Sequence, residues 1–212
     1  ITLMKDELTT SITNMKNGSL RNYTIAKATY YNAILEGLER DVMSVVDYIP
    51  RIYDSAIHSS IPGILVLMPW NDTTESYGNS EMNDTLSEEV NLTQHVALYL
   101  KAIASHNPYT SLVYFATVHG VTGFDQDSVV EIIWGLEGFK SVERPWYVGA
   151  KDAGELIWTK PYVDANTKQL CTTIAAPVYH NGSFIGVVGF DVLLDTLKND
   201  ILAFGTGGRE IG

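Results

Sequence analysis

The sequence predicts an α+β fold in which a long amino-terminal helix packs on a curved antiparallel sheet. Apolar residues recur at helical spacing from residue 8 to residue 49. From residue 111 onward, short runs of β-branched and aromatic residues alternate with turn residues. The pair Asn181-Gly182 separates two of these runs, and Asn-Gly is the strongest short signal for a tight hairpin. The 212 residues suffice for one such core with a helical appendage.

Residues 1–49 are interpreted as a signalling or dimerisation helix. A helix of this length reaches on the order of 70 Å, which is more than a small domain needs. We expect Pro50 to end it, because proline lacks the amide hydrogen that continues a helix. Gly18 is expected to loosen or kink it, and two ordinary helices broken near Gly18 remain the alternative.

Residues 50–204 are expected to form the globular module. A polar loop is predicted over residues 69–87, and a helix is predicted from Ser87 to about Ser105. Residues 120–127 are expected to form a turn. The predicted strands span residues 111–119, 128–135, 155–162, 170–179 and 184–191, and a closing helix spans residues 193–204. Residues 205–212 are interpreted as the start of a linker or of a truncated second module.

The predicted hairpin places Asp191 at the end of an apolar sheet face. With Asn181-Gly182 as its loop, Val178 lies opposite Ile185 and Thr172 lies opposite Asp191. Gly189 leaves free space beside this last pair. Asp191 then either faces a pocket and holds a cationic group or caps the helix that follows it.

Composition excludes several classes of function. A formal charge of −11 argues against nucleic acid or anionic lipid as the main partner. One cysteine, Cys171, and five scattered histidines give no spacing suited to a metal site, and no nucleophile–base pair suggests an enzyme. No cofactor is expected. No stretch reaches the roughly 18 apolar residues that span a bilayer, and the chain, which does not begin with methionine, is interpreted as part of a longer one.

The number of Asn-x-Ser/Thr sequons predicts an exported surface. Chance would give about two in a chain of this composition. The sequence contains six, at Asn17, Asn22, Asn71, Asn83, Asn91 and Asn181.

Three strings in the second half of the chain resemble the double Cache family. They are ERPWYVGA from residue 143, WTKPYVDANTKQLCTTIAAPV from residue 158 and NGSFIGVVGFDVLLDTL from residue 181. Members of this family are the extracytoplasmic sensor domains of chemoreceptors, sensor histidine kinases and related proteins. The resemblance implies a long helix leading from a membrane segment into a PAS-like membrane-distal module, with a second, membrane-proximal module after it.

The amino-acid-binding branch of the family supplies candidate ligand contacts. The resemblance assigns Arg144, Trp146, Tyr147 and Asp191 to the site, and Phe139 stands where that branch has a tyrosine. Arginine offers a planar fork for a carboxylate, and an opposing aspartate would pair with an ammonium group. A surface salt bridge for Arg144 and plain core roles for the two aromatic residues remain the alternatives.

The predicted site therefore lies on one face of the sheet and is enclosed by residues between Trp134 and Tyr147. Its expected lining residues are Phe139, Arg144, Trp146, Tyr147, Tyr162, Asp164, Thr172 and Asp191. The predicted function is extracytoplasmic sensing of an amino acid, amine or small carboxylate by a membrane-anchored receptor that dimerises through its first helix. A ligand-free structural or dimerisation ectodomain and a soluble binding protein are the alternatives.

Overall fold

The computed structural model describes residues 2–78, 83–196 and 198–199. It divides into two compact units, Ile1–Arg40 and Asp41–Gly212, which are described separately. Helix α1, Thr2–Ala56, supplies all the described structure of the first unit and continues into the second. Among the described residues, no helix is long and apolar enough to cross a membrane.

Two predictions about α1 are wrong. Pro50 lies inside the helix, which continues to Ala56, and Gly18 does not interrupt it. Proline in a helix interior removes one backbone hydrogen bond, but the last turns keep an apolar stripe, with Ile49 and Ala56 almost fully buried. Packing of that stripe offsets the lost hydrogen bond. The presence of a proline in the sequence does not reveal such packing.

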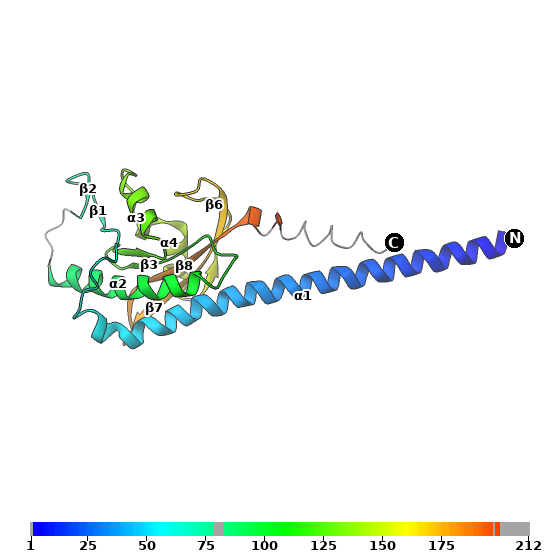
Figure 1. Ribbon diagram of the computed structural model, residues 1–212, viewed down its shortest axis with the longest axis horizontal. Helices are drawn as coiled ribbons and strands as arrows, with labels where there is room; N and C mark the ends of the chain where they lie inside the picture. The colour runs from blue at the N-terminus through cyan, green and yellow to red at the C-terminus, as the bar shows by residue number, and fades with distance from the viewer. Residues whose placement is uncertain (1, 79–82, 197, 200–212) are drawn as a thin grey trace. The chain divides into compact units, whose positions relative to one another are not determined.

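The second unit is built on a six-stranded antiparallel sheet, as predicted (Figure 1). Its strand order is β4-β3-β8-β7-β5, with β6 also paired to β7. The strands are β3 (Leu112–Thr117), β4 (Thr122–Phe124), β5 (Ile157–Trp158), β6 (Tyr162–Val163), β7 (Leu170–His180) and β8 (Ser183–Leu193). A small separate hairpin pairs β1 (Trp70–Asn71) with β2 (Ser76–Tyr77).

Helices cover both faces of this sheet. Helix α2, Asp84–Ala104, packs on one face, where a Cβ atom at Gly123 would touch Thr93 and Ala97. The opposite face carries α3 (Asp127–Trp134), the short helix η1 (Ser141–Glu143) and α4 (Pro145–Ala153). Figure 1 shows the sheet between α2 and the pair α3 and α4. The apolar core on this second face includes Tyr114, Phe124, Ile133, Trp146 and Tyr147.

Several predicted boundaries and element types are wrong. The strand predicted at residues 128–135 is helix α3, whose Val129, Val130 and Ile133 are buried while Trp134 is exposed. A short apolar run does not distinguish a strand from a buried helix. The turn predicted at residues 120–127 contains β4, and the strand predicted at 155–162 divides into β5 and β6. The loop predicted at residues 69–87 contains the β1–β2 hairpin and the start of α2.

Helix α2 begins three residues before the predicted Ser87. Asn83 is its N-cap, and its side chain accepts a hydrogen bond from the Leu86 amide at 2.8 Å. Half of the closing helix predicted at residues 193–204, and all of 205–212, lie outside the described residues.

The β7–β8 hairpin has the predicted turn but not the predicted register. Asn181 and Gly182 both have positive φ, as the turn requires. A bulge between Val178 and Tyr179 then shifts the pairing by one residue, so Thr173 rather than Thr172 lies opposite Asp191. Gly186 makes the bulge possible, because a Cβ there would lie 2.3 Å from the Ala116 carbonyl oxygen. A shift of one residue turns the predicted β7 face to the other side of the sheet.

No sequon asparagine is buried, but three of the six have structural roles. Asn83 caps α2, and Asn91 Nδ2 donates to the Ile57 carbonyl at 2.8 Å. Asn71 Oδ1 accepts from the Thr73 amide at 2.9 Å in a turn. Capping, hydrogen bonding and turn chemistry thus involve three of the six sequon asparagines, and export stays a prediction.

Candidate functional site

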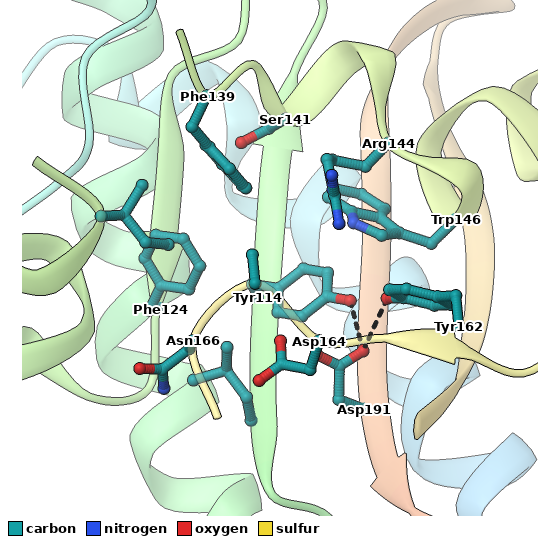
Figure 2. Close-up of a pocket in the computed structure, with 13 residues that line it drawn as sticks. Tyr114, Phe124, Phe139, Ser141, Arg144, Trp146, Tyr162, Asp164, Asn166 and Asp191 are labelled. Atoms are coloured by element: carbon teal, nitrogen blue, oxygen red, sulfur yellow. Dashed lines mark hydrogen bonds between the residues drawn. The ribbon is translucent and has the colours of Figure 1, made fainter. Parts of the chain in front are cut away.

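A cavity with about 370 Å³ of empty volume, partly open to solvent, lies on the α4 face of the sheet (Figure 2). Segment 139–146 supplies four of its lining residues, as predicted for the stretch between Trp134 and Tyr147. The cavity is lined by Leu112, Tyr114, Phe124, Ile133, Phe139, Ser141, Arg144, Trp146, Tyr162, Asp164, Ala165, Asn166 and Asp191.

Six of the eight predicted site residues line this cavity. They are Phe139, Arg144, Trp146, Tyr162, Asp164 and Asp191. The other two do not. The Tyr147 hydroxyl donates to the Thr117 carbonyl at 3.0 Å, and the Thr172 hydroxyl donates to the Thr159 carbonyl at 2.8 Å. Tyr147 is therefore a buried core residue, and the register shift turns Thr172 away from Asp191.

Asp191 lies in the floor of the cavity and is only 3% exposed. Its Oδ1 accepts hydrogen bonds from the hydroxyls of Tyr114 and Thr173, both at 2.6 Å, and lies 3.4 Å from the Tyr162 hydroxyl. Because Asp191 is inside strand β8, the helix-cap alternative is wrong. Burial raises the pKa of its carboxyl to about 6, with a further rise from the nearby charge of Asp164, while these hydrogen bonds oppose the increase.

Tyr114 fills the space that the sequence predicts beside Asp191. It pairs with Gly189 across β3 and β8, and a Cβ at Gly189 would lie 2.3 Å from the tyrosine ring. The glycine lets the ring lie across the strand so that its hydroxyl reaches Asp191. Burial and the charge of Asp191 raise the pKa of Tyr114 well above its ordinary value. Sequence analysis missed this residue, because nothing in the sequence pairs β3 with β8.

Asp164 brings a second carboxylate to the same cavity. It is 8% exposed, and its Oδ2 accepts from the amide and the hydroxyl of Thr167 at 2.5 and 2.6 Å. Within the described residues, its Oδ1 and the Oδ2 of Asp191 accept no hydrogen bond. Two acidic side chains with unused oxygens therefore line the cavity, where they favour a cation.

Arg144 lies in the wall of the same cavity. Its backbone is extended, with φ −76 and ψ 149, as expected for a residue before proline, and it is the N-cap of α4. The guanidinium carbon is 5.5 Å from the centre of the Phe139 ring and 6.0 Å from that of Tyr162. In the described part of the chain, no hydrogen bond or ion pair engages this guanidinium. The cation rests on aromatic rings, so its donors are available to an anion.

Comparisons with known proteins find similar sequences over part of the chain. Residues 133–199 match the family described as methyl-accepting chemotaxis protein-like, first PDC sensor domain. McpA, a methyl-accepting chemotaxis protein of Pseudomonas putida, is 47% identical over 73 residues, which cover 34% of this chain and 11% of that protein. The chain therefore matches only about a tenth of that relative's length.

One solved receptor structure has a related fold. An extracellular ligand binding receptor from Desulfohalobium retbaense matches 81% of this chain and 24% of its own, with 12% identity and a TM-score of 0.52. The ligand-binding domain of the amino acid chemoreceptor PctC of Pseudomonas aeruginosa PAO1, in complex with GABA, matches 78% of this chain and 60% of its own. Its identity is 22% and its TM-score 0.48.

The fold of this chain is similar to that of a solved extracellular ligand binding receptor. The resemblance to the double Cache family is confirmed. More narrowly, residues 133–199 resemble the first sensor domain of methyl-accepting chemotaxis protein-like receptors.

Proposed function

We propose that the second unit binds a free amino acid, or a closely related small carboxylate or amine, as the sensing step of a chemoreceptor. The observation that carries this proposal is the charge arrangement in the cavity. A guanidinium without an ion pair and two carboxylates with unused oxygens line the same buried space. An amino acid presents the two complementary charges on groups attached to one carbon atom.

Each lining group has a defined part in this proposal. Arg144 would hold the ligand carboxylate with its planar fork. Asp191 and Asp164 would accept hydrogen bonds from the ammonium group. The rings of Tyr114 and Trp146, whose centres are 4.6 Å apart, provide an apolar wall. The domain would bind its ligand without transforming it, and binding as proposed needs no cofactor or metal.

The same charges weigh against a ligand-free structural role. A buried carboxylate without a cation destabilises the empty domain. A purely structural core has no need for such a group, whereas a binding site uses it when the ligand arrives. We propose that the domain lies outside the cytoplasm in a membrane-anchored receptor and that the helices pass ligand occupancy onward, in keeping with the receptor families that it resembles.

Replacing Arg144 tests the carboxylate half of the site. We expect Arg144→Ala to weaken amino-acid binding at least 30-fold, because losing a charge-assisted contact in a desolvated site costs about 2–5 kcal/mol. Arg144→Lys keeps the charge without the planar fork, so its affinity for amino acids should lie between those of wild type and Arg144→Ala. Titration calorimetry of the 212-residue chain with the twenty amino acids gives the affinities.

The matched control is Arg51→Ala, which removes an exposed arginine outside the cavity. The amine made by removing the carboxylate from the tightest ligand should bind wild type and Arg144→Ala equally. If wild type binds amino acids and Arg144→Ala binds them as well, the assignment of Arg144 is wrong.

The first unit has a separate proposed role in assembly. Its helix exposes large apolar side chains. Contiguous exposed apolar side chains of this kind mark a surface that a partner covers. They include Leu8, Ile12, Met15, Leu20 and Ile25. We propose that a second copy of this chain covers them in a parallel pair.

Sedimentation equilibrium tests this pairing. The 212-residue chain should associate into dimers as its concentration rises, and the double variant Ile12→Glu, Met15→Glu should remain monomeric. A matched change on the second unit, Val148→Glu, alters an exposed side chain of α4 and should leave association unchanged. A wild-type chain that stays monomeric at millimolar concentration would contradict the proposal.

A further inference from the structure

A second cavity, with about 320 Å³ of empty volume, adjoins the first. The two share the lining residues Phe139 and Ser141, so Phe139 stands between them. The second cavity is lined by Leu67, Met68, Pro69, Trp70, His119, Gly120, Phe139, Lys140, Ser141 and Val142.

The chemistry of this second cavity suits an apolar occupant. Its lysine and its histidine each already contact acidic side chains. Lys140 Nζ lies 2.6 Å from Asp72 and 3.2 Å from Glu143, and His119 Nδ1 lies 2.6 Å from Glu89. The third polar side chain, that of Ser141, is engaged as well, because its hydroxyl accepts a hydrogen bond from Thr122 at 2.7 Å. The remaining lining side chains are mostly aliphatic or aromatic. A charged head group would therefore meet no charged side chain of this cavity that is not already in contact with another.

Phe139 can be displaced without breaking a hydrogen bond of its side chain. The ring is half-buried and forms one side of the cation–π contact with Arg144. In the proposed complex, the ligand carboxylate binds the in-plane donors of the same guanidinium, which the ring contact leaves available. The head group therefore lies close to Phe139, the residue that lines both cavities.

We propose that the two cavities form one site with two compartments, in which the first holds the charged head group and the second takes an apolar side chain. This inference rests on the proposed function, because the head group aligns the side chain. Phe139 is then a specificity-determining residue that sets how large a side chain the site accepts. The expected ligands are aliphatic or aromatic amino acids rather than small or charged ones.

The ratio of leucine to alanine affinity tests this proposal, since both ligands share one head group. Each methylene buried in the second compartment is worth roughly fourfold in affinity. Wild type should therefore prefer leucine by at least tenfold, and Phe139→Ala should increase the ratio further. Val142→Phe fills only the second compartment and should reduce the ratio to near one while leaving alanine binding unchanged. The control Val148→Phe enlarges an exposed side chain on α4 and should change neither affinity.

Xenon binding followed by NMR examines the compartment without any amino acid. Xenon should shift the resonances of residues 67–70 and 142 in wild type and not in Val142→Phe. If xenon binds there and no amino acid binds anywhere, the proposed function fails and the apolar compartment stands. If amino acids bind with equal leucine and alanine affinities in wild type and Val142→Phe, the two-compartment proposal is overturned while the head-group site stands.

Discussion

Asp191→Asn should stabilise the empty domain at neutral pH and at the same time remove most of its affinity for amino acids. The unfolded-state carboxyl titrates near 3.8, whereas burial raises its folded-state pKa to about 6. The folded protein thus resists ionisation, and the charge destabilises it by about 3 kcal/mol once the pH exceeds 6. Asparagine keeps an acceptor oxygen for Tyr114 and Thr173 without the charge. It cannot neutralise a ligand ammonium group, so binding should fall at least 30-fold.

Urea denaturation at pH 4 and pH 7 separates this effect from a general change in packing. At pH 7 the variant should be more stable than wild type by about 1–3 kcal/mol, and at pH 4 the difference should nearly vanish because wild-type Asp191 is protonated. Asp152→Asn is the matched control, since Asp152 is exposed on α4. A variant that is less stable than wild type at both pH values would show that Asp191 is a structural group and not a binding group.

The two charged ends of the site could be predicted from the sequence, and the contacts between them could not. Arg144 and Asp191 stand in local strings whose residue types are informative by themselves. The position of Tyr114 depends on the pairing of β3 with β8, which joins residues 69 to 79 positions apart. Local patterns carry no information on such a pairing, so the group that donates the short hydrogen bond to Asp191 was missed.

The prediction of Thr172 failed for a different reason. The turn was predicted correctly, but one bulge residue between the turn and the site shifts the pairing of β7 with β8 by one residue from Val178 onward. Gly186 lies at the bulge. A glycine in a strand can indicate either a bulge or the close approach of another backbone, and at Gly186 both are present, so the glycine alone did not identify the bulge. The β8 face was predicted correctly, because Asp191 and Gly189 do face the cavity.

Elements defined by strong local signals were predicted better than those defined by packing. The α+β class, the β7–β8 hairpin and most of α1 follow from periodicity and turn chemistry. The apolar run of α3 suits either a strand or a helix, and only its burial pattern decides between them. Similarly, a proline ends a helix only where packing of the following turn does not offset the lost hydrogen bond, and at Pro50 the packing does offset it.

Amino-acid affinity should also depend steeply on pH, and a proton should leave Asp191 as the ligand binds. The ligand ammonium favours the ionised carboxylate, so binding lowers the pKa of Asp191 from about 6. Above this value the carboxylate is already ionised and affinity should be flat. Below it, each pH unit should weaken binding about tenfold, until the pH reaches the carboxyl pKa in the complex. Between pH 7 and pH 4 the expected loss is about 100-fold.

Titration calorimetry in two buffers of different ionisation enthalpy measures both effects. Close to one proton should be released per ligand at pH 5, and almost none at pH 8. Asp191→Asn should bind weakly with no pH dependence in this range, which separates Asp191 from any other titrating group. Arg144→Lys should keep the pH profile of wild type, because it changes the carboxylate end and leaves the ammonium end intact. An affinity that stays constant from pH 8 to pH 4 would mean that Asp191 does not face the ligand ammonium, since a carboxyl with a pKa raised by burial cannot hold a cation without first giving up its proton.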